Sequence, residues 1–384
     1  MKYLILFFLF FFSLPLFSQQ LKTQSQFKTR SLSELSITTD TYILTDFQSG
    51  QILVSKNSFK RIEPASLTKM MTAQIVFSAL KQKRVTLKQS VSVSEEAWRA
   101  QGSRMFIEAG EKVTIEELIN GLIVQSGNDA SIALAEAIAG SEEIFVKMMN
   151  KEAKRLGMKN THFTNSSGLP NPEHFTTAYD LTLLVSDMIR RFPEYYPLYS
   201  LREYTYNKIS QLNRNRLLWL DPNVDGLKTG YTKSAGYCLA ASAKRNNRRL
   251  ISIVLGAKSD RVRTEESQRL LNYGFLSYDT VRVFQKGQKV TGIELWKGQK
   301  ETLQTGFKHD LYLSFPKGHA SKLKATMEYK KPVIAPIKVG QKVGVVHLMF
   351  DGKRIGQYPL VALESIDSSN FFSRTWDEIL LLIN

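Results

Sequence analysis

Apolar and polar residues alternate along residues 41–57 of this chain, in two runs that flank Gln48-Ser49-Gly50. This pattern predicts a β-hairpin. Pro64 then precedes a stretch with helical periodicity, from Ser66 to about Lys81. Further helices are predicted at three places: 131–139 with Gly140 behind it, 142–156, and 179–192. Thr114-Ile115-Glu116-Glu117 is a capping-box sequence that opens one more helix.

Strands dominate the later part of the chain. Residues 236–245 and 249–257 flank Asn246-Asn247, which predicts a second hairpin, and a helix is expected at 261–276. Beyond this helix the chain consists of short alternating runs broken by Gly, Pro and Lys. We therefore predict a separate small all-β domain over residues 281–366.

The last segment, residues 367–384, contains a helical pattern from residue 370 onward. Its polar face contains Arg374, Asp377 and Glu378, and it is too short to span a bilayer. The pattern predicts an amphipathic helix that lies in a membrane interface, although a helix docked on the protein's own core fits it as well. The apolar face is formed by Phe372, Trp376, Ile379, Leu380 and Ile383.

The first residues predict export. Lys2 is followed by an apolar run interrupted by Pro15, and the small residue Ser18 comes just before two glutamines. This arrangement is typical of a cleaved signal peptide over residues 1–18, followed by a polar lead-in over 19–37. An uncleaved anchor helix is the alternative, but the run is shorter than the roughly 20 residues that a membrane span needs.

Composition narrows the choice of partner. The 384 residues carry a net charge of +17, and residues 281–366 alone hold 15 Lys and Arg against 6 Asp and Glu. Such an excess of positive charge favours an anionic partner. Export excludes nucleic acid as that partner, so an anionic lipid surface or an acidic polymer remains. The single cysteine, Cys238, excludes a disulfide framework. The five histidines show no metal-ligand spacing, so we expect neither a metal nor a cofactor.

Three short motifs suggest chemistry together, although each alone is weak. The first is Ser66-Leu67-Thr68-Lys69, in which serine and lysine are three residues apart on one helical face. A serine hydroxyl needs a base within hydrogen-bond reach, and a lysine serves as that base when burial or another cation lowers its pKa. Lys228 is the candidate for that cation. Separately, each motif fits a solvated polar loop equally well.

The second motif is Ser126-Gly127-Asn128, predicted in a loop between two apolar helices. We expect Ser126 to relay a proton and Asn128 to hold Lys69 or a substrate amide. The third is Lys228-Thr229-Gly230, predicted on an edge strand. There Gly230 lets a substrate backbone come close, Thr229 binds a carboxylate, and Lys228 supplies positive charge.

The chain resembles the serine-type D-Ala-D-Ala carboxypeptidases, the low-molecular-mass penicillin-binding proteins of peptidase family S11. The resemblance covers residues 38–280, expected as the catalytic domain, and extends to the motif surroundings, from Glu63 to Thr72 and from Asp225 to Thr232. It implies an α/β (α+β) fold of the penicillin-binding and β-lactamase-like type, with an antiparallel sheet covered by helices on both faces. A β-rich domain followed by a membrane helix is also a layout of this family.

The resemblance implies that Ser66 attacks the bond between the two terminal D-alanines of a peptidoglycan stem peptide. β-Lactams would acylate the same serine, and Arg263 would help bind the terminal carboxylate, unless it only pairs with Glu265 or Glu266. The backbone amides of Ser66 and of the Lys228 strand would hold the oxyanion. The enzyme would act outside the cytoplasm, attached peripherally to the outer face of the cytoplasmic membrane.

Three alternatives remain open from the sequence. A class A-like β-lactamase would need a Glu-x-x-Leu-Asn sequence, which is absent between Ser126 and Lys228, where Glu173 lies in a different pattern. A DD-endopeptidase cutting crosslinks would use the same chemistry. A catalytically idle wall-binding scaffold is the third alternative. The chain also carries Tyr231 after Lys-Thr-Gly, where some relatives carry His.

Overall fold

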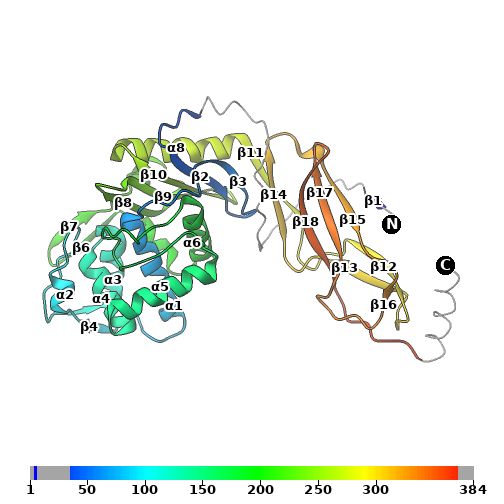
Figure 1. Ribbon diagram of the computed structural model, residues 1–384, viewed down its shortest axis with the longest axis horizontal. Helices are drawn as coiled ribbons and strands as arrows, with labels where there is room; N and C mark the ends of the chain where they lie inside the picture. Colours follow the sequence, from blue (N-terminus) through cyan, green and yellow to red (C-terminus); the bar gives the residue numbers. More distant parts are fainter. Residues whose placement is uncertain (1–3, 7–34, 371–384) are drawn as a thin grey trace. The chain divides into compact units, whose positions relative to one another are not determined.

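The computed structural model describes residues 4–6 and 35–370 (Figure 1). These residues form two compact units. One unit contains the described parts of Arg30–Phe47 and Ile52–Leu276. The other contains Gln48–Gln51, the chain from Ser277 onward, and the short strand near the N-terminus. Each unit has its own buried apolar core.

A five-stranded antiparallel sheet is the centre of the first unit, in the order β3-β2-β10-β9-β8. Both predicted hairpins are confirmed, as β2–β3 and as β9–β10. The third motif lies on β8, which is an edge strand as predicted. The strand bounds are Thr41–Asp46 (β2), Ile52–Lys56 (β3), Val224–Thr232 (β8), Gly236–Arg245 (β9) and Arg248–Ala257 (β10).

Helices cover both faces of this sheet, as expected from the sequence (Figure 1). On one face α8 comes so close that a Cβ at Gly274 would overlap side chains of Leu44 and Leu250. On the other face α6 packs against β2 and β10. The main helices are α1 (Lys69–Lys81), α3 (Ile115–Asn120), α4 (Asn128–Ala139), α5 (Glu142–Leu156), α6 (Ala178–Arg191) and α8 (Asp260–Ser277).

The helix boundaries differ from the prediction at two functional places. Ser66 lies in a separate 3₁₀ turn, η2 (Ala65–Thr68), and α1 begins only at Lys69. Helix α4 begins at Asn128, so the connecting loop is shorter than expected. Short elements that the pattern did not predict are α2 (Glu95–Trp98), α7 (Leu217–Leu220), η4 (Tyr196–Ser200) and the strand pairs β4–β5 (Ser90–Ser92, Lys112–Thr114) and β6–β7 (Glu203–Tyr206, Ile209–Leu212).

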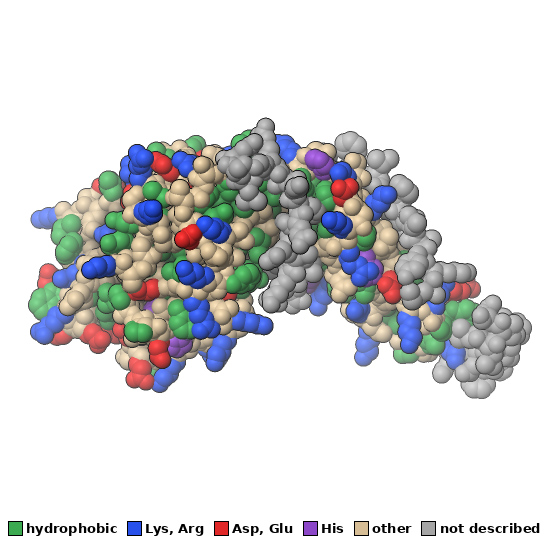
Figure 2. Space-filling model, turned by 45° about the horizontal axis from the view of Figure 1, so that its top comes forward, with side chains coloured by type: hydrophobic (Ala, Val, Ile, Leu, Met, Phe, Trp, Pro, Cys, Tyr) green, Lys and Arg blue, Asp and Glu red, His purple; other side chains and the backbone are tan. Residues whose placement is uncertain are grey.

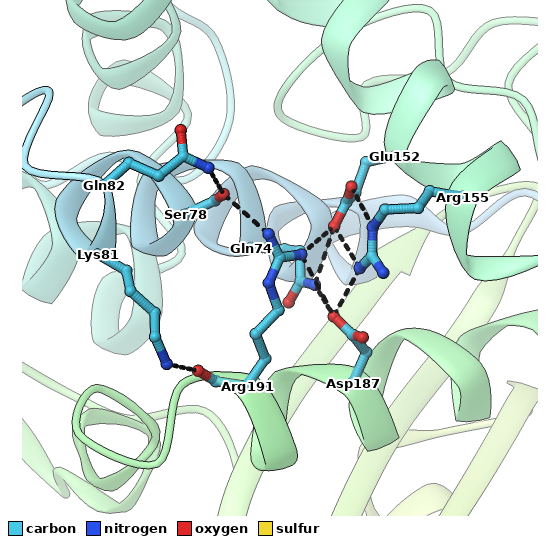
Figure 3. Close-up of polar contacts among 8 residues, drawn as sticks. All are labelled: Gln74, Ser78, Lys81, Gln82, Glu152, Arg155, Asp187 and Arg191. Atoms are coloured by element: carbon cyan, nitrogen blue, oxygen red, sulfur yellow. Dashed lines mark hydrogen bonds and ion pairs between the residues drawn. The ribbon is translucent and has the colours of Figure 1, made fainter. Parts of the chain in front are cut away.

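A polar network joins α1 to α5 and α6 (Figure 3). The Glu152 carboxylate of α5 accepts hydrogen bonds from Arg155 at 2.7 Å and from Arg191 of α6 at 2.8 Å. The buried Gln74 amide of α1 donates to Glu152 and to Asp187. The helix that carries Lys69 is therefore held in place by its neighbours through charge-assisted hydrogen bonds as well as by apolar packing.

The second unit is almost entirely β-structure, with η5 (Ala320–Lys322) as one short turn. Its larger sheet has the order β1-β15-β17-β18-β13-β12-β16, and β11 pairs with β14. The alternating runs predicted here are strands in the structure. Their bounds are Tyr278–Phe284 (β11), Thr291–Trp296 (β12), Thr302–Gly306 (β13), Leu311–Pro316 (β14), Leu323–Glu328 (β15), Val333–Ile334 (β16), Lys342–Phe350 (β17) and Lys353–Ala362 (β18).

The predictions for the two ends concern residues that are mostly not described. Within the predicted signal peptide, Leu4–Leu6 form β1, which pairs antiparallel with β15. The rest of that peptide, most of the lead-in, and the terminal helix beyond Asn370 lie outside the described residues. In the described part of the chain, no helix has both the length and the apolar character that a membrane span requires.

Candidate active site

The first motif starts where the chain turns sharply into η2. Ala65 has a positive φ of 48°, which is unusual for a residue with a side chain and indicates a backbone held by its surroundings. Ser66 follows and remains partly exposed. Lys69 Nζ lies 3.2 Å from Ser66 Oγ, because the turn places the two side chains on one side. This is the contact that the S-x-x-K spacing predicts.

The Lys69 ammonium is enclosed, with 1% of the residue exposed. Its Nζ donates to Asn128 Oδ1 and to the Ser167 carbonyl, both at 2.6 Å. Burial is the main reason that the pKa of Lys69 falls to about 7; the carboxylates of Asp129 and Glu142 oppose this shift, and the charge of Arg214 contributes to it. A fraction of Lys69 is therefore neutral near pH 7 and able to accept a proton.

The second motif follows a π-helical turn at the end of α3, Gly121–Gln125. Ser126 then takes the left-handed conformation, with φ at 61°, and Gly127 is the N-cap of α4. The Ser126 hydroxyl is buried and has no hydrogen-bond partner among the described residues. It is thus available to a substrate group or to a proton in transit. Asn128 contacts Lys69, one of the two roles that the sequence predicted for it.

A buried carboxylate next to this motif fixes a neighbouring loop. Asp129 is fully buried and accepts backbone N–H bonds from Met105 at 3.0 Å and from Phe106 at 2.8 Å. Asn128 donates its own backbone N–H to the Ser103 carbonyl at 2.7 Å. The loop and the second motif therefore form one rigid assembly. Asp129 was not among the residues predicted from the sequence, although an acidic residue at the start of an apolar helix is a visible signal.

The third motif lies against the nucleophile turn. A Cβ built on Gly230 would come within 3.1 Å of Ser66 N and of the Ala65 Cβ, so only glycine lets β8 approach η2 this closely. Lys228 and Thr229 are both buried on this strand. Burial keeps the pKa of Lys228 well below its ordinary value, and the nearby cations Lys69, Arg214 and Arg263 lower it further.

Arg214 is a second residue that was not predicted from the sequence. Its positive charge lowers the pKa of both Lys69 and Lys228, so it lies near both lysines. Nothing in the local sequence, Asn213-Arg214-Asn215, distinguishes this arginine from the others in the chain. Helix α7, which follows Arg214 closely in the chain, contacts β8, and a linear pattern does not reveal this packing.

Arg263 lies behind the third motif. Its guanidinium donates to the Gly230 carbonyl at 2.9 Å and to the Cys238 carbonyl at 3.2 Å, and its ion-pair partner is Asp260. Neither Glu265 nor Glu266, the partners considered from the sequence, forms this pair. Arg263 therefore holds β8 and β9 together at the point where the motif lies, and its proposed contact with a substrate carboxylate remains a prediction.

A turn before α6 supplies the remaining contact to Lys69. Ser167 gives its carbonyl to Lys69, and Gly168 has a φ of 87°, in a space where a Cβ would overlap the Ala65 carbonyl. His174 is buried beside this turn and lies 2.8 Å from the Thr68 hydroxyl through its Nε2. Burial lowers the pKa of His174 to about 4, so this histidine is neutral at pH 7 and serves as a hydrogen-bonding partner within the turn.

The assembled groups are those that acyl transfer requires. A partly exposed hydroxyl has a base of low pKa beside it, a second lysine of low pKa lies on the adjoining edge strand, and a buried hydroxyl has no partner among the described residues. Such an arrangement supports attack on a carbonyl and proton transfer to a leaving group. Within the described ranges, no cluster of His, Cys, Asp and Glu could hold a metal ion.

Comparison with known families gives two matches that together span most of the chain. Residues 28–259 match the model of the D-alanyl-D-alanine carboxypeptidase family. Residues 278–368 match the model described as penicillin-binding protein 5, C-terminal domain. The first match contains all three motifs and ends just before Arg263, and the second coincides with the β-rich unit.

Individual relatives agree with this assignment. The chain is 42% identical to the D-alanyl-D-alanine carboxypeptidase DacC of Escherichia coli, over 90% of this chain and 88% of that protein. Penicillin-binding protein 5 from Haemophilus influenzae has a similar structure, with a TM-score of 0.85 at 40% identity, covering 87% of this chain and 98% of that one. Penicillin-binding protein D2 from Listeria monocytogenes, solved with ampicillin bound, gives a TM-score of 0.58 at 31% identity, over 62% of this chain and 98% of that one. The chain therefore belongs to the D-alanyl-D-alanine carboxypeptidase family of serine peptidases.

Proposed function

We propose that this serine D-Ala-D-Ala carboxypeptidase works through an acyl-enzyme on Ser66. The observation that carries the proposal is the 3.2 Å contact between Ser66 Oγ and Lys69 Nζ, together with the pKa of about 7 for that lysine. Neutral Lys69 takes the hydroxyl proton while Ser66 Oγ attacks the carbonyl of the penultimate D-alanine. The backbone N–H of Ser66 and one from β8 stabilise the oxyanion.

Collapse of this intermediate breaks the peptide bond to the last D-alanine. The departing amine takes a proton that Ser126 and Lys228 relay, and Thr229, with Arg263 behind the strand, binds the carboxylate of the leaving residue. Water then attacks the ester and restores Ser66. In this scheme Asn128 holds Lys69 in place through the 2.6 Å bond to its Oδ1.

A β-lactam presents a strained amide to the same serine, and we expect it to form a stable adduct there. The resemblance to a penicillin-binding protein solved with ampicillin bound supports this expectation. Between Ser126 and Lys228 the chain also lacks the sequence that places the water-activating glutamate in class A β-lactamases. We therefore propose slow release of the drug, as in a target rather than in a resistance enzyme.

Export and membrane attachment are further parts of the proposal. The sequence of residues 1–18 supports secretion, and the amphipathic pattern of residues 370–384 supports peripheral attachment to the outer face of the cytoplasmic membrane. The attachment would be made by the apolar face that contains Trp376 and Leu380. The lysine-rich β-unit adds attraction to anionic lipid, which the polar face of the helix does not supply.

The decisive experiment combines labelling with product analysis. The wild-type chain is incubated with a fluorescent penicillin and, separately, with a muropeptide that bears a pentapeptide stem. We expect a covalent adduct and release of free D-alanine, and Ser66→Ala should abolish both. Labelling that survives in Ser66→Ala would show that another residue is the nucleophile.

The reaction products also distinguish a carboxypeptidase from an endopeptidase and from a catalytically idle scaffold. A DD-endopeptidase would cut crosslinked dimers without releasing D-alanine from the pentapeptide, and a scaffold would do neither.

Lys69→Arg keeps the positive charge but removes the base, and general-base catalysis is typically worth about 10²- to 10⁴-fold in rate. Normal turnover in Lys69→Arg would rule out the role given to this lysine.

A further inference from the structure

One edge of the β-unit carries an unusual exposed surface, residues 330–342, which we call the proline-flanked edge. Val333, Ala335 and Ile337 point into the core of the unit. Between them, Ile334 is 43% exposed, and Val339, just beyond, is 63% exposed. The two exposed aliphatic side chains therefore come from β16 (Ile334) and from the turn before β17 (Val339), beside residues that already pack in the core.

Four lysines accompany these apolar side chains. Lys331 lies 3.8 Å from the exposed Glu294, whereas no ion pair to a described residue is found for Lys330, Lys338 or Lys342. Exposed aliphatic side chains between such lysines are a combination that suits the interface of an anionic bilayer, where the chains enter the headgroup region and the ammonium groups meet phosphates.

The edge is fixed rather than loose. Strand β16 pairs with β12, and Trp296, opposite Ile334, is partly exposed on the same side of the pairing. Ile337 exchanges two backbone hydrogen bonds with Ile366, both at 2.9 Å. Pro332 and Pro336 remove N–H donors from this edge, which disfavours the addition of a partner strand. The proline-flanked edge is therefore better suited to contact a flat bilayer surface than to pair with another β-strand.

The end of the described chain lies at the same place (Figure 1). Ser369 donates its N–H to the Lys297 carbonyl, and Gly298 and Ser368 form a bridge in the hairpin next to β16. The chain therefore leaves the β-unit beside the proline-flanked edge and continues into the segment 371–384. The predicted membrane helix begins within a few residues of this exit.

We propose that the proline-flanked edge is a second membrane contact, which inserts Ile334 and Val339 into the headgroup region of an anionic phospholipid bilayer. This inference rests on the membrane attachment proposed above, because the terminal helix would bring the edge to the surface. The edge then fixes the orientation of the β-unit on the membrane, which one attachment point alone cannot do.

The test measures the partition of the full chain onto vesicles of phosphatidylcholine with and without phosphatidylglycerol. The apolar variant Ile334→Ser with Val339→Ser should bind the anionic vesicles roughly tenfold more weakly than the wild type. Lys338→Gln with Lys342→Gln should weaken binding by a similar factor at low salt. Thermal unfolding of each variant checks that the β-unit remains folded.

A matched control removes two charges at the other end of β17 and β18. Lys353 pairs with Phe350 in register, far along the strands from Lys342, and Arg354 follows it. Lys353→Gln with Arg354→Gln should leave binding within about twofold of the wild type, because the contact is local. Equal losses in this control and in the Lys338 and Lys342 variant would overturn the proposal, since only diffuse charge would then be at work.

The helix is tested separately by Trp376→Ser with Leu380→Ser. If this variant loses binding while the edge variants bind like the wild type, the edge proposal fails and the helix attachment stands. If the helix variant binds like the wild type and the edge variants lose binding, the edge contact stands and the attachment through the helix fails. A further outcome would also overturn the proposal: the edge variants bind vesicles like the wild type but lose binding to purified peptidoglycan. The proline-flanked edge would then be a peptidoglycan-binding surface.

Discussion

Two side chains near Lys69 control its charge in opposite directions. Asp129, fully buried and bonded to the loop at Met105 and Phe106, raises the pKa of Lys69, while Arg214 lowers it. Burial is the largest influence and decides the outcome, a pKa of about 7. The protonation of Lys69 therefore depends on burial and on charged residues outside the three motifs.

This environment predicts the pH dependence of acylation. Lys69 must be neutral to accept a proton, and it is protonated below its pKa of about 7, so the rate should rise with pH and level off above that value. The measurement is the second-order rate of labelling by a fluorescent penicillin as a function of pH. A rate that stays flat from well below to well above pH 7 would contradict Lys69 as the base.

Asp129→Asn provides a sharper test at the same residue scale. Because the Asp129 charge raises the pKa of Lys69, its removal should move the rising limb to lower pH. The weakened loop should also lower the plateau rate by roughly tenfold or more. Asp351→Asn, which removes the same charge from the β-unit, should leave both unchanged. A purely structural role for Asp129 would lower the plateau without moving the limb.

At the scale of elements, the approach of β8 to η2 depends on one glycine. A Cβ at Gly230 would meet backbone atoms, Ser66 N at 3.1 Å and the Pro64 carbonyl at 3.2 Å, which cannot move as a flexible side chain would. The distance between the edge strand and the nucleophile turn is therefore limited by the size of this residue.

Gly230→Ala should thus separate activity from stability. We expect acylation to fall by more than about tenfold, because the oxyanion donors move apart, while the free energy of unfolding changes by about 1–3 kcal/mol. Labelling rates and thermal unfolding measure the two effects. Gly292→Ala, which meets only side-chain atoms of Thr302 and Gln304, is the control. Normal labelling in Gly230→Ala would show that the close approach does not matter.

The network between α1, α5 and α6 gives a prediction on stability (Figure 3). Burial alone would raise the pKa of Glu152, but hydrogen bonds from Arg155 and the nearby charge of Arg191 lower it overall. Glu152→Gln leaves both arginines without their shared carboxylate and should cost about 1–3 kcal/mol at neutral pH. Because the pKa of Glu152 is lowered in the folded state, this contribution is present above pH 4.5 and is lost as the pH falls below the folded value.

Denaturant unfolding at neutral and at acidic pH would test this prediction. The difference between the wild type and Glu152→Gln should shrink at acidic pH, where Glu152 of the wild type is itself protonated. The control is Glu143→Gln on the same helix, because the pair of Glu143 with Lys147 is exposed and contributes little. An equal destabilisation in both variants would mean that the network adds nothing beyond a surface pair.

On the scale of the whole molecule, positive charge is spread widely. Lys and Arg side chains lie over the described surface of both units in the view of Figure 2. By contrast, the site cations Lys69, Lys228 and Arg263 are buried. The net charge of +17 is therefore mainly a property of the surface.

This distribution predicts that membrane binding and catalysis respond differently to salt. Binding to phosphatidylglycerol vesicles should fall several-fold when the ionic strength rises from about 0.05 M to about 0.5 M, because the Debye length falls below about 10 Å. The labelling rate should change little, since the charges that control it are buried. Vesicle sedimentation and labelling in the same buffers would measure both. Salt-independent binding would mean that apolar contacts alone hold the protein.

Local sequence indicated the candidate nucleophile and base but not their environment. Ser66 and Lys69 are three residues apart, so one turn is enough to bring them together, and the structure confirms their contact. The family match confirms the carboxypeptidase activity, while the roles of the two residues stay predictions. The alternating runs likewise predicted the hairpins and the β-rich unit, because strand faces follow a period of two. The start of α4 at Asn128 was missed, since tertiary packing and not local propensity sets that boundary.

Only the tertiary structure decided what surrounds the pair. Asn128 and Ser167, which bind Lys69, lie 59 and 98 residues away from it along the chain, and Arg214 reaches the site from another segment. Burial, the largest cause of the low pKa of Lys69, is a property of the packed molecule and has no signal in four consecutive residues. The sequence thus placed the candidate nucleophile and base next to each other, and the fold decided that the lysine has a pKa of about 7.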